Sequence, residues 1–244
     1  ATLADGISKL KNCAVEPEVV DLINFLNKCG ANIKVKNRTI TIKVVEELNL
    51  EDYKVIPDRI EAGSYILATM ATKGRLRLNN FYPNDLTFPL KIYQDMGLKI
   101  KKISKTSYEF NCKTLKPIKK ISTKEFPGYP TDLQAQLIAT QIKSALKSKV
   151  VENIFENRFI HIPELRRFGA NLSIIGKTVT IHKTLNLFGA EVMATDIRAS
   201  FSLIIAAMMS KGTTVINRIY HLDRGYEDFD LKLKKCGVNI SRKK

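Results

Sequence analysis

The feature that most constrains the fold of this chain is an internal repeat with a period near seventy residues. Four segments share a pattern in which polar residues lead to an apolar residue, a glycine and a second apolar stretch. Their glycines, separated by 67, 72 and 68 residues, are Gly30, Gly97, Gly169 and Gly237. Such a period is too long for a solenoid repeat and fits a supersecondary unit with two helices. We therefore expect four related units, the first represented by its second half alone.

A second pattern recurs with the same period and places an aspartate before an apolar segment of helical spacing. The three segments are residues 56–74, 129–146 and 193–212. An aspartate at this position can accept hydrogen bonds from the first free N–H groups of a helix. The pattern therefore predicts that Asp58, Asp132 and Asp196 each cap a helix.

Each unit follows the order helix–strand–helix–strand–strand. The second helix ends on one of the repeated glycines, which suit a helix C-terminus. A strand pair then turns at an exposed position, such as Asn37-Arg38 in the first unit. Repetition of this order predicts an α/β fold with helices packed beside sheets. A polar stretch that leads into Pro57 places a boundary near residues 50–58, which divides the chain into residues 1–55 and 56–244.

The charge balance favours an anionic partner. Forty Lys and Arg residues against twenty-four Asp and Glu residues give a net charge of +16. Such a field suits a phosphorylated metabolite, a nucleic acid or an acidic membrane face, and a lysine-rich proteome would produce it as well. The sequence contains no apolar run of membrane-spanning length and no signal-peptide pattern at its start. Its four cysteines lie far apart, which argues against a zinc site and favours a reducing, cytoplasmic environment.

Four polar motifs interrupt otherwise apolar segments, each at the boundary of a predicted element. They are PTDLQAQ (130–136), FENRFIH (155–161), ATDIRAS (194–200) and HLDRGYE (221–227). One interpretation is purely structural: the aspartates cap helices and the arginines pair with carboxylates. The other is that Arg158, Arg198 and Arg224 converge, because they recur at comparable repeat junctions. Converged guanidinium groups bind phosphate or carboxylate in bidentate fashion.

These motifs, together with VIPDRIEAG (55–63) and EPEVVDL (16–22), resemble the UDP-N-acetylglucosamine 1-carboxyvinyltransferases, the enolpyruvyl transferases of peptidoglycan synthesis. The resemblance runs from about Thr2 to Arg242. It implies an inside-out α/β barrel built from repeated units, with helices inside and sheets outside, in two lobes. Residues 1–55 then correspond to the last repeat of the first lobe and 56–244 to most of the second lobe. The shikimate-pathway enolpyruvyl transferase shares the architecture, but the FENRF and DRGYE motifs resemble the amino-sugar branch.

The resemblance also implies an activity, which is transfer of the enolpyruvyl group from phosphoenolpyruvate to the 3-hydroxyl of UDP-N-acetylglucosamine. On this basis Asp132 is expected to contact the sugar 3-hydroxyl and remove its proton. Ile154 and Phe155 are expected to line the sugar nucleotide, and Arg224 to hold phosphoenolpyruvate. The cleft residues expected at the reacting centre are Asp196, Arg198 and Arg158.

The resemblance further implies no cofactor and no metal, and a role in cell-wall synthesis and division. Because the family's Lys-Asn pair and its Cys or Asp loop do not occur in residues 1–244, we expect this piece to be inactive without the remaining N-terminal part of the enzyme. Two alternatives stay open at this point. One is a catalytically inactive relative that acts as a scaffold, and the other is a basic nucleic-acid-binding module, which lacks any recognisable recognition helix here.

Overall fold

The computed structural model describes residues 1–144 and 146–243, and the chain divides into two compact units. Unit 1 comprises Ala1–Pro57 with Glu125–Pro127, and unit 2 comprises Asp58–Lys124 and Gly128–Lys244. The division falls beside Pro57, within the segment where the sequence predicts a boundary. In the described part of the chain, no helix is long and apolar enough to cross a membrane.

Unit 1 is a three-stranded antiparallel sheet packed against one helix. Its strands lie in the order β1-β3-β2, and its own small core contains Ile23, Ile33, Ile40 and Ile42. The elements are β1 (Ile7–Lys11), α1 (Pro17–Lys28), β2 (Asn32–Lys36) and β3 (Thr39–Lys43). The hairpin turns at Asn37, whose φ is 54°, as the Asn37-Arg38 turn predicted.

Unit 2 contains three successive repeats: the first two include the predicted helix–strand–helix–strand–strand order, and the third has no strand after its last helix among the described residues. The first comprises α2 (Arg59–Ala71), β4 (Arg75–Leu78), the 3-10 turn η1 (Pro83–Leu86), α3 (Thr87–Asp95), β5 (Lys99–Lys102) and β6 (Tyr108–Asn111). The second comprises β7 (Lys120–Ser122), the 3-10 turn η2 (Thr131–Leu133), α4 (Gln134–Gln141), β8 (Ser148–Val151), α5 (Ile162–Arg167), β9 (Leu172–Ile175) and β10 (Thr178–Ile181). The third comprises β11 (Glu191–Met193), α6 (Ile197–Met209), β12 (Val215–Asn217), α7 (Tyr220–Asp223) and α8 (Phe229–Lys235).

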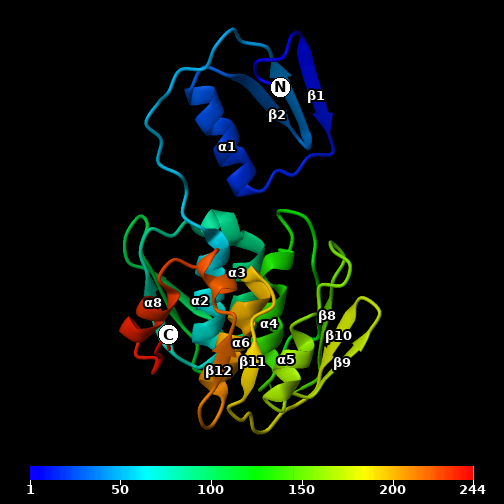
Figure 1. Ribbon diagram of the computed structural model, residues 1–244, viewed down its shortest axis with the longest axis vertical. Coiled ribbons are helices and arrows are strands. Elements are labelled where there is room, and N and C mark those ends of the chain that lie inside the picture. The colour runs from blue at the N-terminus through cyan, green and yellow to red at the C-terminus, as the bar shows by residue number, and fades with distance from the viewer. Residues whose placement is uncertain (145, 244) are drawn as a thin grey trace. The chain divides into compact units, whose positions relative to one another are not determined.

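Three helices of unit 2 lie inside and its sheets lie outside. Helices α2, α4 and α6 pack against one another and lie side by side, with β8, β10 and β9 toward the outside (Figure 1). Every residue of α4 is buried, and the four polar ones (Gln134, Gln136, Thr140 and Gln141) each form at least one hydrogen bond inside unit 2. The sheets have the strand orders β4-β6-β5, β7-β8-β10-β9 and β11-β12. This arrangement agrees with the expected inside-out α/β fold.

The local signals that defined the repeat have the expected structural roles, with two exceptions. The four repeated glycines all have positive φ, between 90° and 107°, after a helix, a conformation that glycine adopts without strain. Asp58 and Asp196 cap α2 and α6 by accepting hydrogen bonds from backbone N–H groups. Asp132 does not cap α4, contrary to the prediction. The last repeat also differs from the prediction, because no strand follows α8 in its described residues.

Candidate active site

Asp132 lies in the 3-10 turn η2, immediately before the buried helix α4. Its carboxylate Oδ1 accepts a hydrogen bond from Arg158 Nη2 at 2.6 Å. The side chain of Asp132 is 37% exposed and that of Arg158 is 23% exposed, so the pair lies at the surface of unit 2. Asp132 is therefore accessible to a ligand, and its charge is paired with an arginine rather than used to cap a helix.

Arg158 also contacts the loop that follows β8. Its guanidinium carbon lies 4.8 Å from the ring centre of Phe155, within range of a cation–π interaction. Phe155 is half-exposed, and Ile154 beside it is partly buried. Three residues predicted for the site, Ile154, Phe155 and Arg158, thus belong to one loop next to Asp132.

Arg198 approaches the same region from the first turn of α6. Its Nη2 lies 3.3 Å from Asp58 Oδ2, and its Nη1 donates to the carbonyl of Gly225 at 3.4 Å. Burial alone would lower the pKa of Arg198, but Asp58, then Tyr226 and least of all Asp132 raise it overall, so the guanidinium stays charged. We call Asp58, Asp132, Arg158 and Arg198 the Asp132 cluster.

Asp196 contributes to the Asp132 cluster through the backbone of α6. Its Oδ1 accepts hydrogen bonds from the backbone N–H groups of Arg198 at 2.8 Å and Ala199 at 2.7 Å. The carboxylate thereby fixes the first turn of α6, from which the Arg198 side chain extends. In this structure Asp196 is a helix cap that positions Arg198.

A buried polar network links α2 and α4 to Tyr226, whose ring the Arg198 side chain of α6 contacts. Tyr226 Oη lies 2.9 Å from Ser64 Oγ of α2, and Gln136 Nε2 of α4 donates to both hydroxyl groups. The Arg198 guanidinium lies over the Tyr226 ring, 5.5 Å from its centre. Burial raises the pKa of Tyr226, although Ser64, Arg198 and Gln136 oppose the shift. Since α2, α4 and α6 meet here, the network fixes Arg198 relative to the turn that carries Asp132.

Glu152, which the sequence analysis did not single out, holds the loop and the turn around the cluster. It is 2% exposed and accepts hydrogen bonds from Thr123, Thr131 and Gln134 side chains and from two backbone N–H groups. Burial alone would raise the pKa of Glu152, but these hydrogen bonds lower it overall. A lone carboxylate within the apolar stretch VVENIF (150–155) was the available sequence signal, because a buried charge requires partners.

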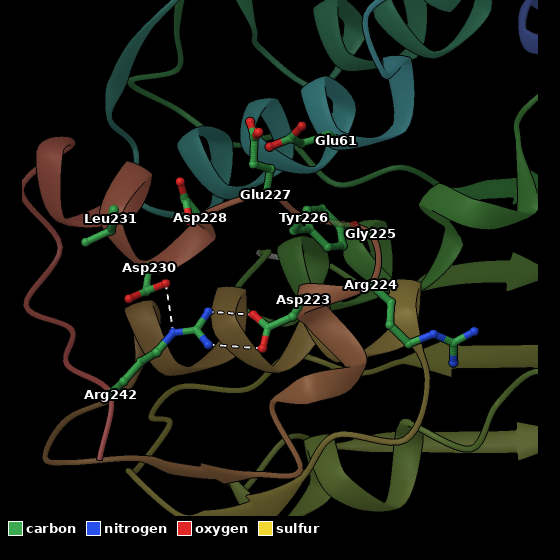
Figure 2. Close-up of a pocket in the computed structure, with 10 residues that line it drawn as sticks. All are labelled: Glu61, Asp223, Arg224, Gly225, Tyr226, Glu227, Asp228, Asp230, Leu231 and Arg242. Carbon is green, nitrogen blue, oxygen red and sulfur yellow. Dashed lines mark hydrogen bonds and ion pairs between the residues drawn. The ribbon is translucent and has the colours of Figure 1, made fainter. Parts of the chain in front are cut away.

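Arg224 has a different environment from the other two arginines. It is exposed at the end of α7 and forms no ion pair with any residue that the structure describes. Figure 2 shows its side chain directed away from Arg242, which pairs with Asp223 and Asp230 in a pocket of about 750 Å³. Most charged groups that line this pocket are carboxylates, so the pocket does not form an anion site. Arg224 directly precedes Gly225, whose backbone carbonyl accepts a hydrogen bond from Arg198.

His161 is fully buried behind the Arg158 loop. Burial and the positive charge of Arg158 lower the pKa of His161 to about 3, and the Arg158 backbone opposes the shift only in part. The imidazole is therefore neutral at physiological pH, which agrees with a structural role.

The structure joins three of the predicted site residues by direct contacts, since Arg158 bonds Asp132 and lies over the Phe155 ring. Arg198 pairs with Asp58 instead. The structural interpretation fits Arg158 and Arg198, which both pair with carboxylates, and the convergence of the three arginines stays a prediction. Guanidinium groups near an accessible carboxylate can bind an anion beside a proton acceptor, which suits transfer of a phosphate-bearing or carboxylate-bearing group.

Comparisons with known proteins identify what the chain is similar to. The family model for EPSP synthase (3-phosphoshikimate 1-carboxyvinyltransferase) matches residues 1–233. The chain is 47% identical over 243 residues to the UDP-N-acetylglucosamine 1-carboxyvinyltransferase of Pelagibacter ubique, covering 99% of this chain and 58% of that protein. It is 45% identical over 243 residues to the protein of the same name from Koribacter versatilis, covering 99% and 56%.

Two solved structures share the fold. The enolpyruvyl transferase NikO from Streptomyces tendae matches with a TM-score of 0.86 at 24% identity, covering 98% of this chain and 57% of that one. The EPSP synthase from Acinetobacter baumannii matches with a TM-score of 0.74 at 15% identity, covering 99% and 59%. The chain therefore spans somewhat more than half the length of each of these four proteins.

Proposed function

This chain belongs to the EPSP synthase (3-phosphoshikimate 1-carboxyvinyltransferase) family, and from that premise we propose that the full-length protein transfers the enolpyruvyl group of phosphoenolpyruvate to the 3-hydroxyl of UDP-N-acetylglucosamine. The observation that carries the proposal is the accessible carboxylate of Asp132, which accepts a hydrogen bond from Arg158 beside the half-exposed Phe155. The names of the two curated relatives support the amino-sugar acceptor over a shikimate acceptor.

The chemistry requires a base, an acid and a positive site for the donor. The 3-hydroxyl oxygen bonds to C2 of phosphoenolpyruvate while a proton adds to C3, and the base takes the hydroxyl proton. Phosphate then leaves as a proton is lost from C3, which restores the double bond. In our proposal Asp132 is the base, and Arg158, Arg198 and Arg224 hold the carboxylate and phosphate of the donor. Ile154 and Phe155 contact the sugar nucleotide.

The position of Asp132 suits this role. A residue that caps a helix has its carboxylate occupied by backbone N–H groups, whereas the carboxylate of Asp132 accepts a hydrogen bond from the Arg158 side chain, which a bound anion can attract. The net charge of +16 would raise the local concentration of both anionic substrates.

The proposal extends to the organisation and the setting of the protein. We assign residues 1–55 to the last repeat of a first lobe and residues 56–244 to most of a second lobe, and we expect turnover to require further residues of the same enzyme. The small-molecule substrates would be its only partners, with no nucleic acid and no membrane. The enzyme would act in the cytoplasm in peptidoglycan synthesis, and so in cell shape, the cell cycle and cell division.

Replacement of Asp132 in the full-length protein tests the proposal. We expect Asp132→Ala to lower kcat by about a thousandfold, since a general base contributes on that order, while the folded structure is retained. Phosphate release with both substrates measures the rate. Asp95→Ala, at the exposed end of α3, is the matched control and should keep wild-type turnover.

Two results would contradict the proposal. One is an absence of phosphate release by the wild-type protein when both substrates are present. The other is turnover by Asp132→Ala within threefold of the wild-type rate. A steeply salt-dependent gel shift with nucleic acid, without saturation by UDP-N-acetylglucosamine, would support the basic binding module instead.

A further inference from the structure

Glu152 is a buried carboxylate whose charge is balanced by hydrogen bonds alone. No basic side chain in the described ranges forms an ion pair with it, although it is 2% exposed. Five donors surround it instead. Such an arrangement fixes the donors in place, because a buried carboxylate loses a large free energy of hydration unless its acceptor positions are filled.

The two oxygens of Glu152 contact two different parts of the site. Oε1 accepts from Thr123 Oγ1 at 2.8 Å and from the backbone N–H groups of Ile154 and Phe155 at 2.8 and 3.1 Å. It therefore holds the loop proposed to contact the sugar nucleotide. Thr123 Oγ1 also accepts from the Asn153 N–H at 2.8 Å, which extends this contact by one residue.

Oε2 contacts the turn that carries the proposed base. It accepts from Thr131 Oγ1 at 2.8 Å and from Gln134 Nε2 at 3.4 Å. These two residues flank Asp132 on either side within η2 and the start of α4. The contact also explains why Asp132 does not cap α4, since the turn is held toward Glu152 and the helix begins two residues later.

We propose that Glu152 is a positioning residue that fixes Asp132 relative to the Ile154–Phe155 loop. Its Oε2 holds the turn that carries Asp132, and its Oε1 holds the loop. The inference rests on the proposed function for the roles of Asp132 and the loop. In this inference Glu152 contacts neither substrate. The Oε2 contact is expected to affect kcat, and the Oε1 contact is expected to affect KM for UDP-N-acetylglucosamine. Misplacement of a reacting group by about 1 Å can reduce a rate on the order of a hundredfold, so small shifts of this turn matter.

Separate removal of the two contacts tests the proposal in the full-length protein. Thr131→Val removes the donor to Oε2 and should lower kcat about tenfold, with KM for UDP-N-acetylglucosamine within twofold of wild type. Thr123→Val removes the donor to Oε1 and should raise that KM about tenfold, with kcat within twofold. Thr140→Val is the matched control: this buried threonine of α4 bonds backbone carbonyls of Leu67 and Gln136, and its loss should change neither constant.

Glu152→Gln provides an independent test. The amide oxygen is expected to replace Oε1, which has three donors, and the amide nitrogen can then donate to Thr131 Oγ1, because a hydroxyl oxygen is also an acceptor. The variant should therefore keep both constants closer to wild type than either threonine variant does, and adding Thr131→Val to it should lower kcat as in Thr131→Val alone. Amide hydrogen exchange at Ile154 and Phe155 should stay slow in Glu152→Gln and become faster in Thr123→Val.

The outcomes separate the two proposals. Suppose that the wild-type protein turns over. If both Thr131→Val and Thr123→Val then change the same kinetic constant, or if Thr131→Val has no more effect than Thr140→Val, Glu152 has only a structural role and the inference is wrong. If the wild-type protein does not turn over, the proposed function is wrong. Equal exchange rates at Ile154 and Phe155 in all variants would then contradict the positioning claim as well.

Discussion

Three aspartates occupy equivalent places in the repeat but have two different roles. Asp58 and Asp196 cap their helices, whereas Asp132 pairs with Arg158. The difference arises from partners that are distant in the sequence, since Arg158 follows Asp132 by 26 residues. The repeat places a carboxylate at the start of each of the three inner helices. Arg158 of the FENRF loop forms an ion pair with one of them, which therefore does not cap its helix.

His161 should make the stability of the protein depend on pH. Its folded-state pKa of about 3 lies below the ordinary value of 6.5, so the unfolded chain binds more protons between these values. This contribution to stability is complete above pH 6.5 and decreases as the pH falls toward 3. We expect His161→Gln, which cannot be protonated, to show a smaller decrease in the urea midpoint between pH 7 and pH 5. Equal decreases in the variant and the wild type would contradict this explanation.

The candidate site was predictable from sequence to the extent that its residues interrupt apolar segments. Asp132, Arg158 and Arg198 stood out for this reason, whereas the convergence of Arg158, Arg198 and Arg224 that the repeat spacing predicts stays a prediction. Glu152 escaped notice because one carboxylate in an apolar stretch resembles the end of a strand. Its role depends on Thr131, which only the fold brings to it.

At the level of elements, the predictable parts were those with local signals. The glycine at each helix end and the aspartate before α2 and α6 act within one turn of the backbone, so their sequence patterns suffice. Strand β8 ends at Val151, and the side chain of the next residue, Glu152, accepts hydrogen bonds from the N–H groups of Ile154 and Phe155. Short strands such as β7 and β11 carry too few residues to show an alternating pattern.

Loss of the α6 cap should have a definite energetic cost. Asp196→Ala removes an acceptor for the N–H groups of Arg198 and Ala199, so we expect the free energy of unfolding to fall by about 1 kcal/mol. Asp196→Ser, which can still cap, should recover most of that loss. Urea denaturation followed by circular dichroism measures both.

The same substitution at Asp132 is the informative comparison. Because its carboxylate caps no helix, Asp132→Ala should not carry this capping cost. A stability loss equal to that of Asp196→Ala would show that the two aspartates have the same structural role after all.

For the whole molecule, the repeat and the family resemblance predicted the fold class. The division into two units corresponds to two separate hydrophobic cores. The core of unit 2 is drawn from residues between Ile60 and Leu233, whereas unit 1 has a core of four isoleucines. The two clusters share no residue. A core as small as that of unit 1 buries little apolar surface and stabilises its unit weakly.

We therefore expect urea to unfold unit 1 at a lower concentration than unit 2. Ile40→Ala in the small core should reduce the stability of unit 1 by about 3 kcal/mol, with no change in the transition of unit 2. Ile181→Ala, at a fully buried position in unit 2, is the matched control and should move only the later transition. Because the chain contains no tryptophan, hydrogen-exchange mass spectrometry across a urea series is the suitable measurement, since it assigns each transition to its peptides. A single transition that both substitutions shift equally would mean that the two cores unfold as one cooperative structure.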